Sequence, residues 1–251
     1  MRVTTYNLLR SSCSASPSDY EMQAGGHPFN LWPLRLPSIK AILQNADSDI
    51  FLLQEVTEQM LSDIARDNPH MKEYAFEITR GNRDSLECAI YYKISRFRLV
   101  QRIEYPFRAL TLILSSNNGT DTIAITTCHL KAGENLHNDV IRERQARTIV
   151  QTMASVGAIR QIIGGDLNSD RNLWRYYTRS PQALGVFERD QFFSNNDTLP
   201  TFYGWEHLKL DYIFAKHIKF DLSNKASTLV APGPNKNSPS DHAALTASFN
   251  F

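Results

Sequence analysis

The chain has 251 residues, and its 27 lysine and arginine residues nearly balance its 26 aspartate and glutamate residues, giving a formal net charge of +1. Hydrophobic residues make up 42% and charged residues 21%, which is typical of a globular protein and excludes a disordered or collagen-like chain. The balanced charge argues against a protein that bulk positive charge holds to nucleic acid or membrane, although a local basic groove is compatible with it.

Short runs with β-type composition recur from the first residues of the chain to the last. In chain order they are Val3–Tyr6, Ile50–Leu53, Cys88–Tyr92, Leu110–Leu114, Thr122–Thr127, Gln161–Gly164, Leu210–Phe214 and Ala243–Phe249. Several of these runs are apolar at every position rather than at alternate positions, which indicates strands that are covered on both faces.

Three stretches between these runs carry apolar residues at helical spacing. They are Ser38–Ala46, Thr57–Arg66 and Asp139–Met153. Thr57 stands where an N-cap would begin the second helix. In the third helix Val140 belongs to the apolar side. The arginines opposite it are expected in solvent, namely Arg142, Arg144 and Arg147, although Arg144 and Gln145 could instead point toward a functional site. Many strands and few helices predict an α/β protein in which helices lie outside two packed sheets.

Two long loops flank polar motifs. Arg10–Leu31 is rich in serine, glycine and proline, and Ala231–Pro239 carries three prolines immediately before Ser240-Asp241-His242. Long loops beside polar motifs in a compact domain are more often functional than idle. No internal repeat or low-complexity linker divides the chain, so we expect one domain over residues 1–251.

Cysteine usage and hydropathy bear on the compartment. Cys13, Cys88 and Cys128 are an odd, sparse set that suits a reducing environment better than a disulfide framework. No apolar targeting segment precedes the first strand, and the run Leu110–Leu114 is far too short to span a bilayer. We therefore expect a monomer of the cytoplasm, or of the nucleus, without a membrane or an obligate protein partner.

Polar side chains interrupt the apolar runs at six places where predicted strands begin or end. These side chains belong to Asn7, Gln54-Glu55, His129 with Lys131, Asp166 with Asn168, Asp211, and Asp241-His242. Burying an unpaired carboxylate costs several kcal/mol. The six interruptions should therefore converge where they can satisfy one another, around a cation.

This set of side chains has a definite chemistry. Hard oxygen ligands come from Asn7, Glu55, Asp166 and Asp241, and such ligands favour Mg²⁺ or Mn²⁺ over Zn²⁺. His129 and His242 could hold a phosphate oxygen or move a proton, and Asp211 is a natural group to orient one imidazole. The set fits metal-assisted attack of water on a phosphoryl centre.

Taken singly, each residue also has an ordinary structural explanation. Glu55 could be a surface residue or a helix cap, His129 a half-buried histidine, and Gly164-Gly165-Asp166 a turn that ends a strand. Together, the order and type of all six groups match one known scheme.

That scheme resembles the endonuclease/exonuclease/phosphatase superfamily, which has the deoxyribonuclease-I-like fold. The matching motifs are Thr5-Tyr6-Asn7-Leu8, Leu53-Gln54-Glu55-Val56, Cys128-His129-Leu130, Gly165-Asp166-Leu167-Asn168, Leu210-Asp211-Tyr212-Ile213 and Ser240-Asp241-His242. The resemblance covers essentially the whole chain. It implies a four-layer α/β sandwich of two packed, mostly antiparallel sheets flanked by helices, with the site at one edge of the paired sheets.

The resemblance also implies a metal-binding and phosphate-binding half of the site. Glu55 would be the main ligand of a Mg²⁺ or Mn²⁺ ion, with Asn7 and Asp241 nearby. Asp166 and Asn168 would position or deprotonate the attacking water and hold the phosphate.

The imidazoles form the other half. Asp211 would orient His242, which contacts the scissile phosphate, and His129 would bind a non-bridging oxygen and stabilise the charge of the transition state. The general base is either His242 or Asp166.

The branch of the superfamily is less defined. Trp32-Pro-Leu-Arg35, ahead of the first predicted helix, resembles deadenylase-type and several bacterial members. Residues 50–153 also resemble the tyrosyl-DNA phosphodiesterase branch, although that branch carries an acidic residue where this chain has Leu9.

Basic and aromatic residues near these motifs are candidates for substrate binding. The segment Arg171–Arg179 interleaves arginines with aromatic residues, a texture that suits strand phosphates and stacked bases. The substrate contacts that we expect are Arg35, Lys131, Arg171, Trp174, Arg175, Phe202 and Trp205. The segment could instead be a solvated helix face, and the aromatic residues ahead of Asp211 could be core.

We therefore expect a metal-dependent nuclease that acts on single-stranded or end-exposed nucleic acid, either RNA or DNA. The alternatives are a hydrolase of a small or lipid-linked phosphate ester, a 5′-tyrosyl-DNA phosphodiesterase and a non-catalytic binding module. A carboxylate-built site concentrates negative charge, so the balanced overall charge can conceal a basic rim around an acidic centre.

Overall fold

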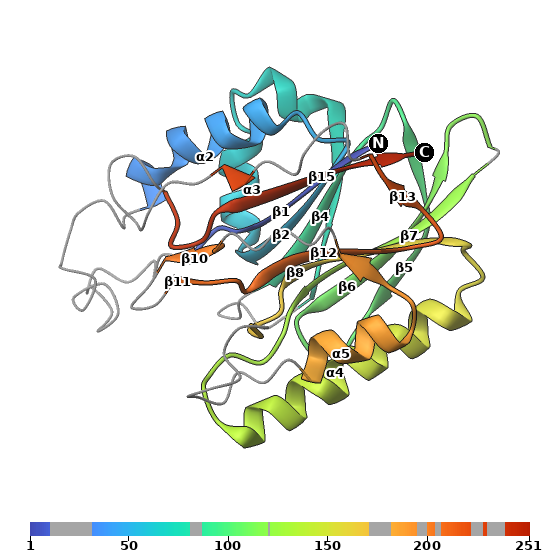
Figure 1. Cartoon of the computed structure of the whole chain (residues 1–251). Helices are drawn as coiled ribbons and strands as arrows, with labels where there is room; N and C mark the ends of the chain where they lie inside the picture. Colours follow the sequence, from blue (N-terminus) through green and yellow to red (C-terminus); the bar gives the residue numbers. More distant parts are fainter. Residues whose placement is uncertain are drawn as a thin grey trace.

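A computed structural model describes residues 1–10, 32–80, 87–119, 121–170, 182–194, 200–203, 207–221, 228–229 and 239–251 of the chain. Two twisted β-sheets face each other in it, with helices on both outer sides (Figure 1). The predicted α/β fold with two packed sheets flanked by helices is confirmed. One domain over residues 1–251 stays a prediction.

The first sheet has seven strands. They are β1 (Arg2–Asn7), β2 (Ile50–Val56), β3 (Tyr74–Ile78), β4 (Glu87–Lys93), β13 (Lys219–Phe220), β14 (Thr228–Leu229) and β15 (Ala244–Asn250). Their order across the sheet is β13-β15-β1-β2-β4-β3, and β14 also pairs with β15. Every neighbouring pair is antiparallel except β1 and β2.

The second sheet has six strands in the order β5-β6-β7-β8-β12-β9. They are β5 (Phe97–Glu104), β6 (Ala109–Ser116), β7 (Thr122–His129), β8 (Arg160–Asp166), β9 (Phe193–Ser194) and β12 (Asp211–Lys216). Only β7 and β8 are parallel in it. A separate short hairpin consists of β10 (Phe202–Tyr203) and β11 (His207–Leu208).

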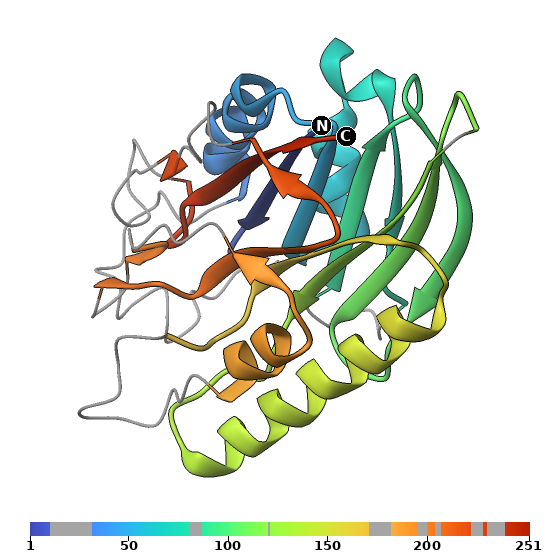
Figure 2. The same cartoon turned by 45° about the vertical axis from the view of Figure 1, so that its right-hand side comes forward.

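The helices complete a four-layer arrangement. The first sheet is covered by α2 (Trp32–Ala46) and α3 (Glu58–Ala65), followed by a 3₁₀ helix, η2 (Pro69–Glu73). The second sheet is covered by α4 (Leu136–Ser155) and α5 (Gln182–Arg189), which lie side by side across its outer face (Figure 2). One apolar cluster lies under each pair of helices, and another fills the space between the two sheets.

All eight predicted strands are present, as β1, β2, β4, β6, β7, β8, β12 and β15. Sequence reasoning missed the edge strands and α5. β5 lies at the edge of its sheet and leaves side chains such as Val100 in solvent, so its sequence lacks the continuous apolar run of a buried strand.

Two helix predictions need correction. α2 begins at Trp32 rather than Ser38, so the Trp32–Arg35 motif lies inside the helix and not ahead of it. Pro33 occupies the first turn, where the main-chain N–H has no helical partner, and Pro37 is accommodated one turn later.

α4 also differs from its prediction. Val140 is exposed, whereas Arg142 is completely buried instead of solvated. The Arg142 guanidinium donates to the carbonyl oxygens of Lys131 and Gly133, at 2.7 and 2.9 Å, and pairs with Asp139. These bonds compensate the burial of the charge.

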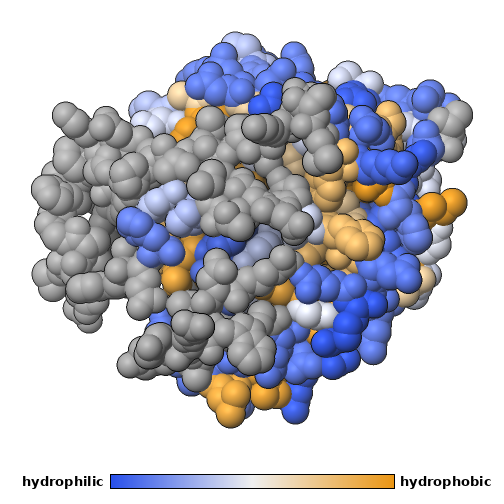
Figure 3. All heavy atoms as spheres, viewed as in Figure 1, coloured by the Kyte–Doolittle hydropathy of each residue, from blue (hydrophilic) through white to orange (hydrophobic). Residues whose placement is uncertain are grey.

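Exposed large hydrophobic side chains are scattered over the described part of the surface. Hydrophilic side chains dominate the described part of the surface in Figure 3. The exposed large hydrophobic side chains come from several elements, and only two of them, Leu136 and Val140 on α4, share a helix. They are Leu34, Phe76, Ile94, Val100, Leu136, Val140, Ile159 and Phe193. None of the helices in the described ranges combines the length and hydrophobicity that crossing a bilayer requires.

Two glycines let β8 approach its neighbours closely at the end that carries Asp166. A Cβ atom on Gly164 would lie 2.6 Å from the Leu52 side chain of the opposite sheet. A Cβ atom on Gly165, whose φ is +152°, would lie 1.9 Å from the carbonyl oxygen of Cys128 on β7. The close packing therefore requires glycine at both positions, and this packing sets the position of Asp166, which follows them.

Replacement of Gly165 by alanine tests this requirement. Because overpacking against main chain costs about 1–3 kcal/mol in addition to the strain of the backbone, we expect Gly165→Ala to lower the free energy of unfolding by about 3 kcal/mol or more. The matched control is Gly119→Ala, which has positive φ but open space around the new Cβ, and should cost about 1 kcal/mol. Equal losses in urea unfolding would contradict the packing argument.

Candidate active site

The second sheet presents three predicted site residues in one row. β7 and β8 are parallel, so their carboxyl ends meet, and His129 pairs in register with Asp166. β12 is antiparallel to β8, so its first residue, Asp211, lies opposite Asp166. The strand directions thus place two carboxylates and an imidazole side by side at one edge.

The first sheet supplies the facing half of the site. Asn7 is the last residue of β1, and Glu55 lies near the end of β2, the parallel neighbour of β1. Asp241 and His242 directly precede β15, which runs antiparallel to β1. All the strands that carry these residues therefore open at the same edge of the sandwich.

Asn7 joins the two halves. Its side-chain Nδ2 donates to Glu55 Oε1 and to Asp166 Oδ2, each at 3.1 Å, and lies 3.5 Å from His242 Nε2. His129 Nε2 is 3.6 Å from Asp166 Oδ2 and 3.9 Å from Glu55 Oε1. One buried amide thus links carboxylates from opposite sheets, with an imidazole on either side.

His242 is held in one orientation by Asp211. Its Nδ1 is 2.7 Å from Asp211 Oδ2, and its Nε2 lies 3.6 Å from Asp166 Oδ2. Burial by itself would lower the pKa of His242, but the negative charges of Asp211 and Asp166 hold that pKa well above its ordinary value. With Nδ1 donating to Asp211, only Nε2 faces the centre of the site.

Asp241 stands in an electrostatically crowded position. Burial, together with the negative charges of Glu55 and Asp166, raises the pKa of Asp241 to about 6, against the opposing effect of His242. Its Oδ1 is buried and has no hydrogen-bond partner among the described residues. A further positive charge at this point would relieve the repulsion.

The donor set therefore fits a hard divalent cation. Four carboxylates meet here with two imidazoles, which can supply at most two positive charges, and the oxygen donors are of the kind that Mg²⁺ and Mn²⁺ prefer. Within the described ranges, no three acidic, histidine or cysteine side chains are already arranged as a finished metal cage. The residues suit the ion by chemistry rather than by a preformed geometry.

The backbone around the site is strained at three residues. Leu9, Glu55 and Asn168 all have positive φ, at 53°, 57° and 49°. Two of these residues direct a main-chain N–H at a functional oxygen: Leu9 at Asn7 Oδ1 (3.0 Å) and Asn168 at Asp166 Oδ1 (2.9 Å). The N–H of Arg10 likewise donates to Glu55 Oε2 at 3.2 Å. Such strain is typical of functional sites.

Two hydroxyl residues to which sequence reasoning gave no role hold the loops of the site. Ser240 Oγ donates to the Asn7 carbonyl at 2.7 Å and accepts from the N–H of His242. Thr201 Oγ1 accepts from the N–H of Asp211 at 2.9 Å. A serine two residues ahead of a histidine is a local sequence signal for such a turn. The bond from Asp211 to Thr201 has no such local signal and is seen only in the folded structure.

The structure gives Arg35 a different environment from the predicted one. Arg35 is buried in α2, and its guanidinium donates to the carbonyl oxygens of Leu8 and Pro239, both at 2.6 Å, and to that of Leu9. These carbonyls belong to the loops that carry Asn7 and Asp241. The placement does not support the predicted substrate contact and gives Arg35 a structural role instead.

The other predicted substrate contacts are distributed as follows. Lys131 is exposed beside His129. Phe202 is partly buried, with its ring 5.1 Å from that of His242 and tilted by 57°. Arg171, Trp174, Arg175 and Trp205 lie outside the described residues, as does the greater part of the loop Arg10–Leu31.

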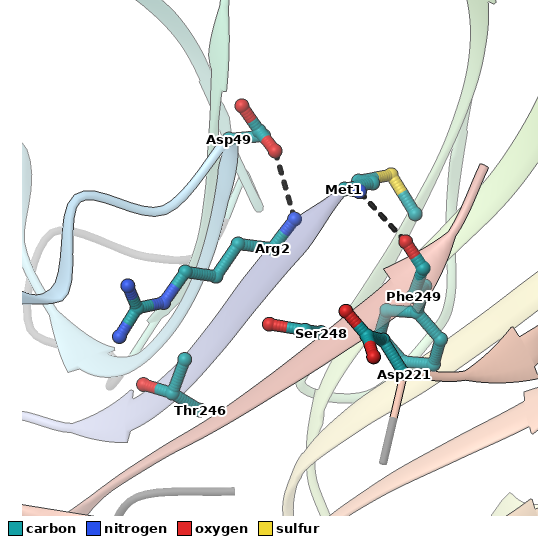
Figure 4. Close-up of a pocket in the computed structure, with 7 residues that line it drawn as sticks. All are labelled: Met1, Arg2, Asp49, Asp221, Thr246, Ser248 and Phe249. Atoms are coloured by element: carbon teal, nitrogen blue, oxygen red, sulfur yellow. Dashed lines mark hydrogen bonds between the residues drawn. The ribbon is translucent and has the colours of Figure 1, made fainter. Parts of the chain in front are cut away.

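A cavity of about 300 Å³ lies at the other end of β1 (Figure 4). It is lined by Met1, Arg2, Asp49, Asp221, Thr246, Ser248 and Phe249. Asp49 there accepts from the main-chain N–H of Arg2 at 2.7 Å. None of the predicted site residues lines this cavity, so it is separate from the candidate active site.

Comparison with protein families gives a match over most of the chain. Residues 4–242 match the model of the Endonuclease/Exonuclease/phosphatase family. Comparison with curated protein sequences finds no match.

Solved structures share the fold at low sequence identity. The catalytic domain of human Nocturnin with bound sulfate is 19% identical, with a TM-score of 0.72 over 100% of this chain and 94% of that one. ANGEL2, a 2′,3′-cyclic phosphatase in complex with adenosine-2′,3′-vanadate, is 20% identical, with a TM-score of 0.72 over 99% and 94%. The mannosyl-6-phosphatase of Bacteroides thetaiotaomicron is 17% identical, with a TM-score of 0.69 over 100% of both chains.

The role of Arg35 can be tested by Arg35→Met. The variant leaves buried carbonyl oxygens without their donor, and each such acceptor costs about 1–3 kcal/mol, so we expect the free energy of unfolding to fall by about 3 kcal/mol or more. The exposed Arg98 provides the control, since Arg98→Met should change stability by less than about 0.5 kcal/mol. A rise in KM with unchanged urea unfolding would instead assign Arg35 to substrate binding.

Proposed function

The chain belongs to the endonuclease/exonuclease/phosphatase family, whose members hydrolyse phosphoester bonds, and we propose that it is a divalent-metal-dependent phosphodiesterase acting on nucleic acid. The observation that carries the proposal is the Asn7 amide between Glu55 and Asp166, with His129 and His242 within 4.0 Å of the Asp166 carboxylate. Carboxylates, an amide and two imidazoles then face one point, where a scissile phosphate can be bound and attacked.

Glu55 and Asp241, with Asn7 nearby, would hold a Mg²⁺ or Mn²⁺ ion. When bound, the ion polarises a phosphoryl oxygen and neutralises charge on the phosphate. Asp241 would contribute the buried oxygen for which the described residues offer no hydrogen-bond partner, and Glu55 the carboxylate whose charge raises the pKa of Asp241.

Asp166 would accept the proton of the attacking water. The N–H of Asn168 fixes its Oδ1, while its Oδ2 faces the centre of the site. Asp211 fixes the ring of His242, so that Nε2 is directed at the substrate. His129 and His242 are then available to donate to the non-bridging and leaving oxygens of the phosphate as negative charge develops.

A single-stranded or end-exposed strand is the substrate that we favour. The partly buried Phe202 ring beside His242 can stack on a base or a sugar, and Lys131 lies exposed beside His129 to meet a neighbouring phosphate. The basic-aromatic segment Arg171–Arg179 supports the same substrate class on sequence grounds.

A hydrolase of a small phosphate ester is the second candidate. The net charge of +1 supports it, and so does the structural similarity to a mannosyl-6-phosphatase. Salt dependence separates the two classes, because displacing counterions from a polyanionic strand makes binding fall steeply with ionic strength. A KM that stays constant between low and moderate salt would favour the small ester.

Hydrolysis by the purified protein tests the proposal directly. With Mg²⁺ or Mn²⁺, single-stranded RNA or DNA should be cleaved, and 5′-tyrosyl DNA, 2′,3′-cyclic nucleotides and sugar phosphates complete the panel. Asp166→Asn removes the proton acceptor and should lower kcat by about 10²–10⁴-fold, while chelation by EDTA should abolish turnover.

Asp190→Asn is the matched control for this substitution. Asp190 pairs with Lys216 on the second sheet at 2.9 Å, away from the site, and the variant should retain the wild-type rate. Near wild-type turnover by Asp166→Asn, or activity that survives EDTA, would show that the assigned mechanism is wrong.

A further inference from the structure

A buried layer of amide and hydroxyl groups separates the apolar core from the charged site. It consists of Thr5 on β1, Gln54 on β2 and Thr127 on β7, whose side chains are all completely buried between the two sheets. Towards the interior this layer is followed by apolar residues such as Leu52. Burying polar groups at this depth is costly unless every one of them is hydrogen-bonded.

The Gln54 side chain bonds to both other members of the layer, and its Nε2 is also 3.1 Å from Thr5 Oγ1. Its Nε2 lies 3.0 Å from Thr127 Oγ1 and 2.9 Å from the Leu52 carbonyl oxygen, so each of its two hydrogens has an acceptor. Its Oε1 accepts from Thr5 Oγ1 at 3.3 Å. The bond to Thr127 crosses from the first sheet to the second, and the bond to Thr5 joins parallel neighbours within the first sheet.

Each member of this layer lies next to a site residue along its own strand. Thr5 is two residues before Asn7, Thr127 is two residues before His129, and strand residues two apart point to the same face at a spacing of about 7 Å. Gln54 directly precedes Glu55, whose positive φ turns it towards the site. The layer therefore lies immediately beneath the groups that face one another in the site.

We propose that Gln54 is a positioning residue that sets the separation and register of β2 and β7, and thereby holds Glu55 opposite His129. The effect on catalysis that we expect from this inference rests on the proposed function. An apolar side chain would fill the same space but would leave the sheets free to settle at other distances, whereas a hydrogen-bond network that joins the two sheets favours one arrangement.

Substitution of a residue with a merely structural role would also lower the stability of the protein. The test therefore compares variants of matched stability. Gln54→Met and Thr127→Val each remove the bond between the sheets, while Thr127→Ser keeps the hydroxyl. The control is Thr126→Val on the same strand. Thr126 is equally buried and loses a 2.6 Å hydroxyl contact to Thr111, but it faces the α4 side of the second sheet.

Hydrolysis of bis(4-nitrophenyl) phosphate with Mn²⁺ supplies the kinetic readout. Supporting interactions around catalytic groups typically contribute 10–100-fold, so kcat should fall by about that factor in Gln54→Met and Thr127→Val at unchanged KM. Thr127→Ser should restore kcat, and Thr126→Val should keep it despite a similar loss of thermal stability. An equal fall in kcat in Thr126→Val would overturn the positioning role.

The imidazole NMR signals of His129 supply a readout that needs no activity. They should shift in Gln54→Met and Thr127→Val and stay unchanged in Thr126→Val, because only the first two variants alter the separation of the sheets at His129. A wild-type protein that hydrolyses none of the phosphoesters would refute the proposed function, while the His129 signals would still decide the positioning role. Unchanged His129 signals in Gln54→Met would refute that role whatever the kinetics show.

Discussion

The site depends on one electrostatic constraint, which is that three buried carboxylates and one partly buried carboxylate meet at one edge of the two sheets. They belong to Glu55, Asp166, Asp211 and Asp241. Charges so close and so poorly hydrated repel one another, and protein groups offset only part of that cost. The Asn7 amide serves two of the carboxylates, and His242 pairs with a third. The remaining negative charge is not compensated within the described part of the chain, and it contributes to the raised pKa of Asp241. This uncompensated charge favours the binding of a divalent cation.

The two sheets are organised to hold this costly arrangement in place. Three layers follow one another along the strands in the space between the sheets. The first is apolar, the second is the layer around Gln54, and the third holds the charged groups. Parallel pairing of β1 with β2 and of β7 with β8 brings strand ends together, and the antiparallel neighbours β12 and β15 add strand beginnings at the same edge. Gly165 lets β8 approach β7 closely, and buried Arg35 joins the two loops that carry Asn7 and Asp241.

The sequence predicts the parts of this arrangement that depend on local pattern. Apolar runs that end in a polar side chain identify residues such as Asp166, because this pattern can be recognised in the sequence without tertiary structure. Arg142 was assigned wrongly, since an arginine on an amphipathic helix is expected in solvent, and no local pattern indicates that Arg35 is buried. Their burial depends on main-chain carbonyls that only the folded loops bring within reach. The link from Gln54 to Thr127 spans 73 residues of chain and has no local signature.

Crystals grown with Mn²⁺ provide the most direct measurement of the central claim, because the anomalous signal locates the ion without any assumption about substrate. The account predicts a single strong peak about 2.1 Å from an oxygen of the Glu55 carboxylate, at the edge where Asn7 and Asp241 meet it. An ion found only in the cavity beside Asp49 and Asp221, at the other end of β1, would contradict the account, as would the absence of any ion at Glu55.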